Sequence, residues 1–393
     1  MAKFENSIYA KIWDSREGRD IMNIIVANPD LIHSNHTFWQ EKFTVDSQIT
    51  PTQPDGKAPF TVFMRQQETG GMMDMRAPLG DSMVAERGNA RFYMGVIPDF
   101  IAKGYVEKAP EREYKEQLFA QFGNDELVRG FVTDWLQPAL DSANQTLSNM
   151  AAQIMSTGRI FWNFEDGIKN MPVLKADIPT ENFLKAGAVV WADTTNCNIL
   201  DQVRKIYKDV REHLGVNMLM QLEITRNMWN NYWLNNAQVK ELIRYYASLN
   251  NQLFPEVFEA DTEMAMNAIR RANFGDDMPT IVIVEESQFN KAAGATVHGW
   301  NDSIAVLRPI GYAGTVRRTA ILDEYVYKKY GTKLIDRSFS SALGGVAVIM
   351  NSVINNGNLK EWHSDLMMSA VPALDEFLYH FIIDTTQTSS STF

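Results

Sequence analysis

Hydrophobic residues recur with a helical period over two long stretches of the chain. Between residues 125 and 157, apolar side chains return every three or four positions, which predicts one long helix. Pro138 lies inside this stretch and either kinks the helix or restarts it, because proline lacks the backbone N–H. Gly158 ends the pattern as a C-cap residue. A second helix is predicted over residues 200–214, with Asn198 as its N-cap.

Alternating apolar and polar positions predict a long β-hairpin over residues 59–95. Phe60, Val62 and Met64 mark one side of its first strand, and a return strand is expected around residues 73–76. The hairpin has few aliphatic residues, and an isolated two-stranded hairpin is only marginally stable in water. We therefore expect it to pack on its own domain or to lie on a neighbouring molecule.

Shorter apolar runs predict the strands of a sheet in the remainder of the chain. We expect strands at 159–164, 218–224, 280–284, 303–307, 343–350 and 376–383, and short helices at 225–233 and 237–248. No internal repeat is visible, and helices and strands mix along the chain. The pattern predicts a mixed α+β fold.

The stretch TPTQPDGKAP, beginning at Thr50, marks a boundary, because closely spaced prolines and glycine favour an extended connection. Residues 1–58 lack one sustained period and are predicted to form an N-terminal arm. A chain of 393 residues has room for two or three compact domains. The pattern itself marks two segments, 1–58 and 59–95.

Composition and charge narrow the classes of function. The formal net charge is −11, which opposes a protein that grips nucleic-acid phosphates through a basic surface. The lone cysteine, Cys197, cannot form an intramolecular disulfide and is expected to be a small buried residue. We find neither a signal peptide nor a run of about 20 apolar residues, so we expect a chain made in a cytoplasm and no membrane partner.

Catalytic and ligand-binding motifs are missing from the sequence. It has no phosphate-binding glycine loop, no G-x-S-x-G nucleophile turn and no zinc-ligand spacing. His33 and His36 are three residues apart, but two ligands do not complete a zinc site. We therefore predict no catalytic residue, no cofactor-binding residue, no metal ligand and no cofactor.

Other candidates for chemistry have simpler interpretations. The acidic pairs Asp276-Asp277 and Glu285-Glu286 are expected at solvated strand or loop ends. Trp229 and Trp233 would share a helix face, which is more often core or interface than a platform for ligands. Arg317-Arg318, beside two glycines, is a weak candidate for binding phosphate.

The order of segments resembles that of the lambda-like major capsid proteins of tailed bacteriophages, which have the Hong Kong ninety-seven phage capsid fold. The resemblance covers about residues 58–384. It rests on five segments in this order: PFTVFMRQQETGGMMDMRAPLG leading to RFYMGVIPDF, AAQIMSTGRIFWNF, WADTTNCNILDQVRKIYKDVREHLG, MPTIVIVEES followed by DSIAVLRPIG, and EWHSDLMMSAVPAL. The stretch 225–275 has no counterpart in this pattern.

The resemblance implies a structural role and a domain for each segment. It implies an N-terminal arm (1–58), an extension-loop hairpin (59–95), a peripheral domain with a long spine helix (96–190), an axial domain (191–330) and a return to the peripheral domain (331–393). Copies of the chain would form pentamers and hexamers of an icosahedral shell in the virion, assembled in the host cytoplasm. The shell would enclose double-stranded DNA without sequence-specific binding, and scaffold, portal and decoration proteins would be further partners.

Two alternatives stay open from the sequence. The first alternative is another shell or tail structural protein. The second is an enzyme whose site has no recognisable motif. A shell subunit associates with itself through the arm and hairpin, whereas an enzyme needs a polar cluster with perturbed pKa values in a pocket.

Overall fold

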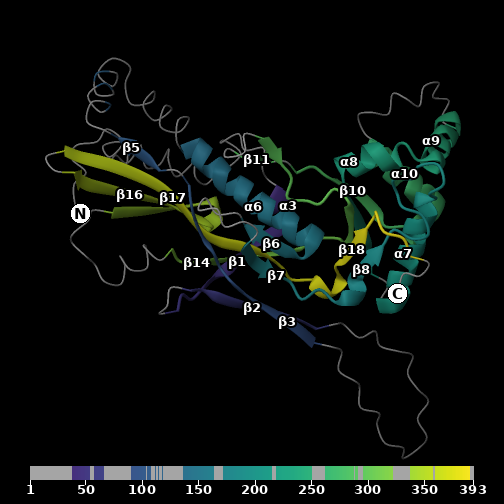
Figure 1. Cartoon of the computed structure of the whole chain (residues 1–393), viewed down its shortest axis with the longest axis horizontal. Coiled ribbons are helices and arrows are strands. Elements are labelled where there is room, and N and C mark those ends of the chain that lie inside the picture. Colours follow the sequence, from purple (N-terminus) through teal and green to yellow (C-terminus); the bar gives the residue numbers. More distant parts are fainter. Residues whose placement is uncertain are drawn as a thin grey trace, which may run out of the picture.

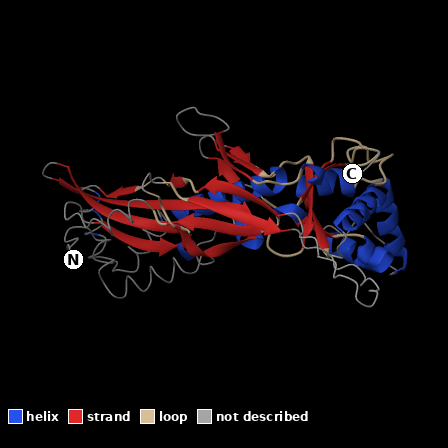
Figure 2. Cartoon of the chain, turned by 90° about the horizontal axis from the view of Figure 1, so that it is seen from below, coloured by secondary structure: helices blue, strands red, loops and turns tan. Residues whose placement is uncertain are grey.

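The chain has a mixed α+β fold in a computed structural model, as the sequence predicts (Figure 1). The long axis runs from a sheet of extended strands to a part rich in helices (Figure 2). The structure describes Glu111, Tyr114, Gln117 and residues 38–53, 57–65, 90–102, 104–107, 136–162, 171–214, 218–249, 262–286, 288–290, 295–321, 337–356 and 359–389.

The described helices are α3 (Phe38–Lys42), α6 (Gln137–Thr157), α7 (Ile199–Leu214), α8 (Arg226–Met228), α9 (Ala237–Leu249) and α10 (Thr262–Phe274). The described strands are β1 (Phe43–Thr50), β2 (Pro59–Arg65), β3 (Ala90–Val96), β4 (Asp99–Ile101), β5 (Tyr105–Glu107), β6 (Arg159–Trp162), β7 (Met171–Lys175), β8 (Phe183–Lys185), β9 (Met220–Thr225), β10 (Thr280–Val284), β11 (Gln288–Asn290), β12 (Ala295–Val297), β13 (Ile304–Pro309), β14 (Gly314–Thr319), β15 (Arg337–Ala342), β16 (Ala347–Asn356), β17 (Leu359–Leu374) and β18 (Phe381–Asp384).

Two sheets organise these elements. The long sheet has the strand order β1-β14-β17-β16-β15, with β4 and β5 also pairing with β17. Its strands β16 and β17 are antiparallel from Ala347↔Met368 to Asn356↔Leu359. The small sheet has the order β10-β9-β13-β18-β8 and mixes parallel with antiparallel pairs.

The small sheet separates two hydrophobic cores. Every residue of β9 and β13 is buried. Ile304 and Val306 lie in the first core, which contains α6, whereas Ala305 and Leu307 lie in the second core, which contains α7. Since successive strand residues point to opposite faces, the sheet forms a wall between the two cores.

The predicted long helix is confirmed where the structure describes it. Leu140, Leu147 and Ile154 are fully buried along one side of α6. Gly158 ends the helix in the left-handed region (φ 69°), and its N–H donates to the Ile154 carbonyl at 2.9 Å. Pro138 lies in the first turn of α6, where a missing N–H costs little. Residues 118–135 lie outside the described residues.

The second helix and several strands also follow the sequence pattern. In α7, Asn198 acts as predicted, since its side-chain oxygen accepts the N–H of Asp201 at 3.1 Å. The strands predicted at 159–164, 218–224, 280–284 and 303–307 are β6, β9, β10 and β13. The short helices predicted at 225–233 and 237–248 also form, the first as α8 followed by a π-helical turn.

Two predicted strands begin later than their apolar runs. Leu343–Gly345 is a short 3-10 turn with Leu343 at φ 50°, and β16 begins only at Ala347. Phe377–Tyr379 is another such turn before β18. All three residues of this second turn are buried, so an apolar run here fills a corner between the sheets instead of extending a strand.

Residues 38–50 belong to the folded body, although their sequence has no sustained period. Phe38 and Trp39 of α3 and Phe43 of β1 are buried in the first core. Strand β1 pairs in parallel with β14, from Phe43↔Gly314 to Thr50↔Thr319. The predicted arm 1–58 thus has a well-packed end, while residues 1–37 lie outside the described part.

Gly314 is the position where a side chain should cost most. It pairs with Phe43 of β1 and with Leu374 of β17, and a Cβ there would meet the backbone carbonyl oxygen of Ala373. Because backbone cannot rotate away, we expect Gly314→Ala to lower the free energy of unfolding by roughly 1–3 kcal/mol. Urea denaturation followed by circular dichroism measures this loss. As a control, Gly275→Asn should cost no more than about 1 kcal/mol, because its Cβ meets open space and Asn is one of the residues that adopt positive φ at moderate cost.

Candidate functional site

The two faces of the hairpin base differ in their surroundings. Strands β2 and β3 pair in antiparallel register from Pro59↔Val96 to Arg65↔Ala90. The return strand expected around 73–76 lies outside the described residues, and the described partner of β2 is β3. In an antiparallel pair, opposed residues share a face, so alternate pairs point to opposite sides of the ribbon.

The inner face packs on the subunit itself. Phe60, Val62 and Tyr93 are at most 7% exposed and belong to the first core. The Tyr93 hydroxyl donates to the Leu374 carbonyl at 2.8 Å, and its ring meets Phe377 edge-on at 5.2 Å. These contacts hold the base of the hairpin in one orientation.

The outer face is apolar and exposed. Phe63, Phe92 and Met94 are 61%, 58% and 68% exposed, and Val96 is 43% exposed. Phe63 and Phe92 are directly opposed in the register. A contiguous apolar surface of this kind marks an interaction site more often than a free surface. The sequence signal for it was Phe63, which occupies the polar register of an alternating strand.

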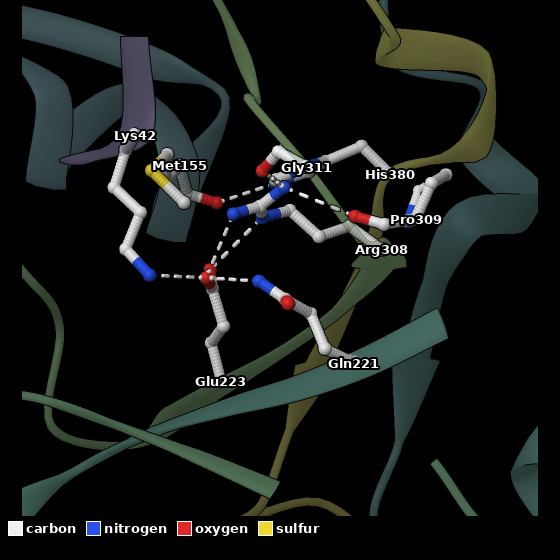
Figure 3. Close-up of polar contacts among 8 residues, drawn as sticks. All are labelled: Lys42, Met155, Gln221, Glu223, Arg308, Pro309, Gly311 and His380. Carbon is white, nitrogen blue, oxygen red and sulfur yellow. Dashed lines mark hydrogen bonds and ion pairs between the residues drawn. The ribbon is translucent and has the colours of Figure 1, made fainter. Parts of the chain in front are cut away.

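A buried ion cluster lies where α3 meets the small sheet (Figure 3). Glu223 of β9 is fully buried and binds Arg308 of β13 through both carboxylate oxygens, at 2.9 and 3.1 Å. Lys42 at the end of α3 approaches the same carboxylate at 2.7 Å, and the Gln221 amide donates to it at 2.8 Å. Sequence reasoning did not identify these residues, since no motif connects them.

The cluster keeps Glu223 ionised. Burial alone would raise the pKa of Glu223, but the charges and hydrogen bonds of Arg308 and Lys42 outweigh it and hold the pKa at about 2. Removing one partner of such a buried pair is costly, because the remaining charge keeps its desolvation penalty. Among the described residues, the polar contacts of the cluster are all with groups of the chain itself.

His380 lies beside this cluster and stays neutral. Burial lowers its pKa to about 4, and the charge of Arg308 acts in the same direction. Its Nε2 is 2.6 Å from the Met155 carbonyl oxygen at the end of α6. Because a carbonyl only accepts, Nε2 carries the proton and donates it.

The arginine pair predicted as a weak phosphate site is occupied by protein groups. Arg317 forms ion pairs with Asp46 at 2.6 Å and with Asp375 at 2.8 Å. Arg318 donates to the carbonyls of Asp46 and Gly344 at 3.0 and 2.9 Å. Arg317 thus connects β14 with β1 and with the residue after β17, whereas Arg318 connects β14 with β1 and with the turn at Leu343–Gly345, so the phosphate interpretation loses its support.

The acidic pairs are also structural. Asp277 forms an exposed ion pair with Arg204 at 3.2 Å, and Glu285 pairs with Arg226. Glu286 is buried, against expectation, and accepts two backbone N–H groups at 2.7 and 3.1 Å. These bonds hold Gly299 and Trp300, which follow β12, in place.

Trp191, Trp229, Trp233 and Cys197 lie in the second core. Trp229 and Trp233 stack with their ring centroids 5.9 Å apart, and Trp191 meets Trp233 edge-on at 6.0 Å. All three are buried, so they are core residues and not a ligand platform. Burial raises the pKa of Cys197 to about 11, which keeps the thiol protonated.

Within the described ranges, no three His, Cys, Asp or Glu side chains gather around a point that would hold a metal ion. His33 and His36 lie outside those ranges. None of the described helices has both the length and the apolar character needed to cross a membrane.

Comparisons with known proteins add matches of low similarity. No family model and no curated protein matches the sequence. A phage-related protein from Bordetella bronchiseptica RB50 aligns over 92% of this chain and 96% of its own, with 11% identity and a TM-score of 0.44. The capsid of Myoviridae phage XM1 aligns over 89% and 91%, with 12% identity and a TM-score of 0.40. The capsid of cyanophage P-SCSP1u aligns over 90% and 88%, with 7% identity and a TM-score of 0.41. All three TM-scores lie below 0.5.

His380 should make stability depend on pH in weak acid. Its folded pKa of about 4 lies below its usual value, so its contribution is complete above about pH 6.5 and is lost as pH falls toward 4. We expect the free energy of unfolding to fall by up to about 3 kcal/mol more over this range in the wild type than in His380→Gln, which keeps an N–H donor without titrating. Urea unfolding at a series of pH values measures both slopes. Parallel profiles would show that His380 does not titrate with folding.

Proposed function

We propose that this chain is the major capsid protein of a tailed bacteriophage, a structural subunit and not an enzyme. It assembles with copies of itself into the pentamers and hexamers of an icosahedral head. The observation that carries the proposal is the hairpin base, which is anchored on its own subunit by Tyr93 while it presents Phe63, Phe92 and Met94 to solvent. A rigidly held apolar ribbon gains stability when a neighbouring copy covers it.

The order of the elements supports the proposal. A hairpin precedes the long helix α6, which ends at Gly158 and continues into β6. Helix α7 then leads into the small sheet, and the chain returns to the long sheet through β14 to β17. This is the order of segments in the lambda-like capsid proteins that the sequence resembles.

Each part then receives a role in the shell. The hairpin 59–95 is the extension loop, and residues 96–190 and 331–393, with α6 and most strands of the long sheet, are the peripheral domain. Residues 191–330, with most of the small sheet and helices α7 to α10, form the axial domain around the symmetry axes. Residues 1–58 are the N-terminal arm, although 38–50 are packed in the body.

The charge of the chain suits a shell around DNA. A net charge of −11 limits adsorption of the genome, and Arg317 and Arg318 are both bound to protein groups. The protein would enclose double-stranded DNA in the virion without sequence-specific contacts. Scaffold, portal and decoration proteins are the further partners that the resemblance implies.

Substituting the outer face of the hairpin should block assembly without unfolding the subunit. In the double variant Phe63→Ser/Phe92→Ser, both changed side chains are exposed, so stability should change by less than about 1 kcal/mol. We expect closed, uniform particles from the wild type, and monomers or small rings from the variant. Electron microscopy together with light-scattering mass, on protein co-expressed with its genomic neighbours, distinguishes these states.

Thr61→Ser on the same face is the matched control and should assemble like the wild type. If the double variant assembles equally well, the hairpin face is not the contact. If the wild type itself stays small in the presence of its genomic neighbours, the capsid proposal is wrong.

A further inference from the structure

Two segments connect the long sheet with the small sheet, and they lie side by side. Residues 309–314 lead from β13 to β14, and residues 374–381 lead from β17 to β18. Gly314 pairs with Leu374, and the Asp375 N–H donates to the Ala313 carbonyl at 3.2 Å. We call these two segments the joint.

The buried ion cluster holds the first segment of the joint by hydrogen bonds and lies beside the second. Arg308 donates to the carbonyls of Pro309 and Gly311 in the first segment, at 3.0 and 2.8 Å. In the second segment, His380 lies against the same cluster and binds the Met155 carbonyl at the end of α6 (Figure 3). The joint is therefore surrounded by polar contacts that a change of angle would disturb.

Lys42 reaches this region from a third direction. Its Nζ binds Glu223 of the small sheet at 2.7 Å, and its carbonyl accepts the N–H of Ala313 in the joint at 2.7 Å. The Arg308–Glu223 pair lies within the small sheet, so it would move as one unit. The Lys42–Glu223 pair, in contrast, joins α3 on the long-sheet side to β9 of the small sheet.

Residues 38–50 are fixed firmly to the long-sheet side. The Trp39 indole N–H donates to the side-chain oxygen of Asn144 in α6 at 3.0 Å, in a buried bond. Immediately after Lys42, β1 runs parallel to β14 at the edge of the long sheet. If the small sheet turned away from this support, Lys42 and Glu223 would separate, leaving Lys42 buried without its ion-pair partner.

We propose that residues 38–50 act as a strap, in which Lys42 clamps the joint and fixes the angle between the two sheets. This inference goes beyond the proposed function, because it concerns the subunit before any assembly. It gives the packed end of the N-terminal region a role in conformation that is separate from contacts with neighbours.

Amide hydrogen exchange on the full chain tests the strap. In Lys42→Met the apolar stem is kept and the charge is lost. We expect exchange at the joint amides, such as Ala313 and Asp375, to rise on the order of tenfold, since the loss of a buried partner makes local opening easier. Amide exchange in α7 and in the paired strands β2 and β3 should stay within about twofold of the wild type, since local opening of the joint leaves other units protected.

Lys208→Met is the matched control, because Lys208 is exposed and pairs with Glu212 at 3.7 Å on α7. It should leave the joint unchanged. If Lys42→Met does not fold, Lys42→Gln replaces it with the same expected pattern. Exchange that rises equally in all elements, or a joint as protected as in the wild type, overturns the proposal. Because all proteins are compared in the same assembly state, either result is independent of whether the chain builds a shell.

Discussion

The ion pair between Glu223 and Arg308 is the constraint on which much of this structure depends. The small sheet is buried on both faces, so a carboxylate on it must be paired. The bond to Glu223 fixes the position of the Arg308 guanidinium. The other N–H groups of this guanidinium donate to the carbonyls of Pro309 and Gly311. It also brings Lys42 to the same point from a segment 181 residues earlier in the chain. One buried charge thereby defines how the two sheets meet.

The two cores on either side of the small sheet have different characters. The first joins α6, the hairpin base and the long sheet, while the second joins α7 with Trp191, Trp229 and Trp233. The small sheet is the wall that these two cores share. In a shell, forces between neighbours would pass through this wall and through the joint beside it.

In the proposed shell, the hairpin divides stability and association between the two faces of one ribbon. The inner face, with Tyr93 hydrogen-bonded to Leu374, contributes to the subunit. The outer face contributes nothing until another surface covers it. Repeated by symmetry, many modest contacts of this kind give a large assembly its stability, because each added contact is effectively intramolecular.

Features that depend on neighbouring residues were predictable from the sequence by itself. Gly158 ends α6 and Asn198 caps α7 because capping uses backbone groups within one turn. The alternation that places Phe60 and Val62 on one face predicts the first strand of the hairpin, because successive strand residues point to opposite faces. The remaining features arise from contacts between residues far apart in the chain. Trp39 and Phe43 are buried in the core, and Phe377 lies in a short turn between two strands. Arg317 pairs with Asp46 and Asp375. Lys42 pairs with Glu223. These outcomes depend on contacts between residues far apart in the chain, and burial and charge pairing at such distances leave no periodic trace in the sequence.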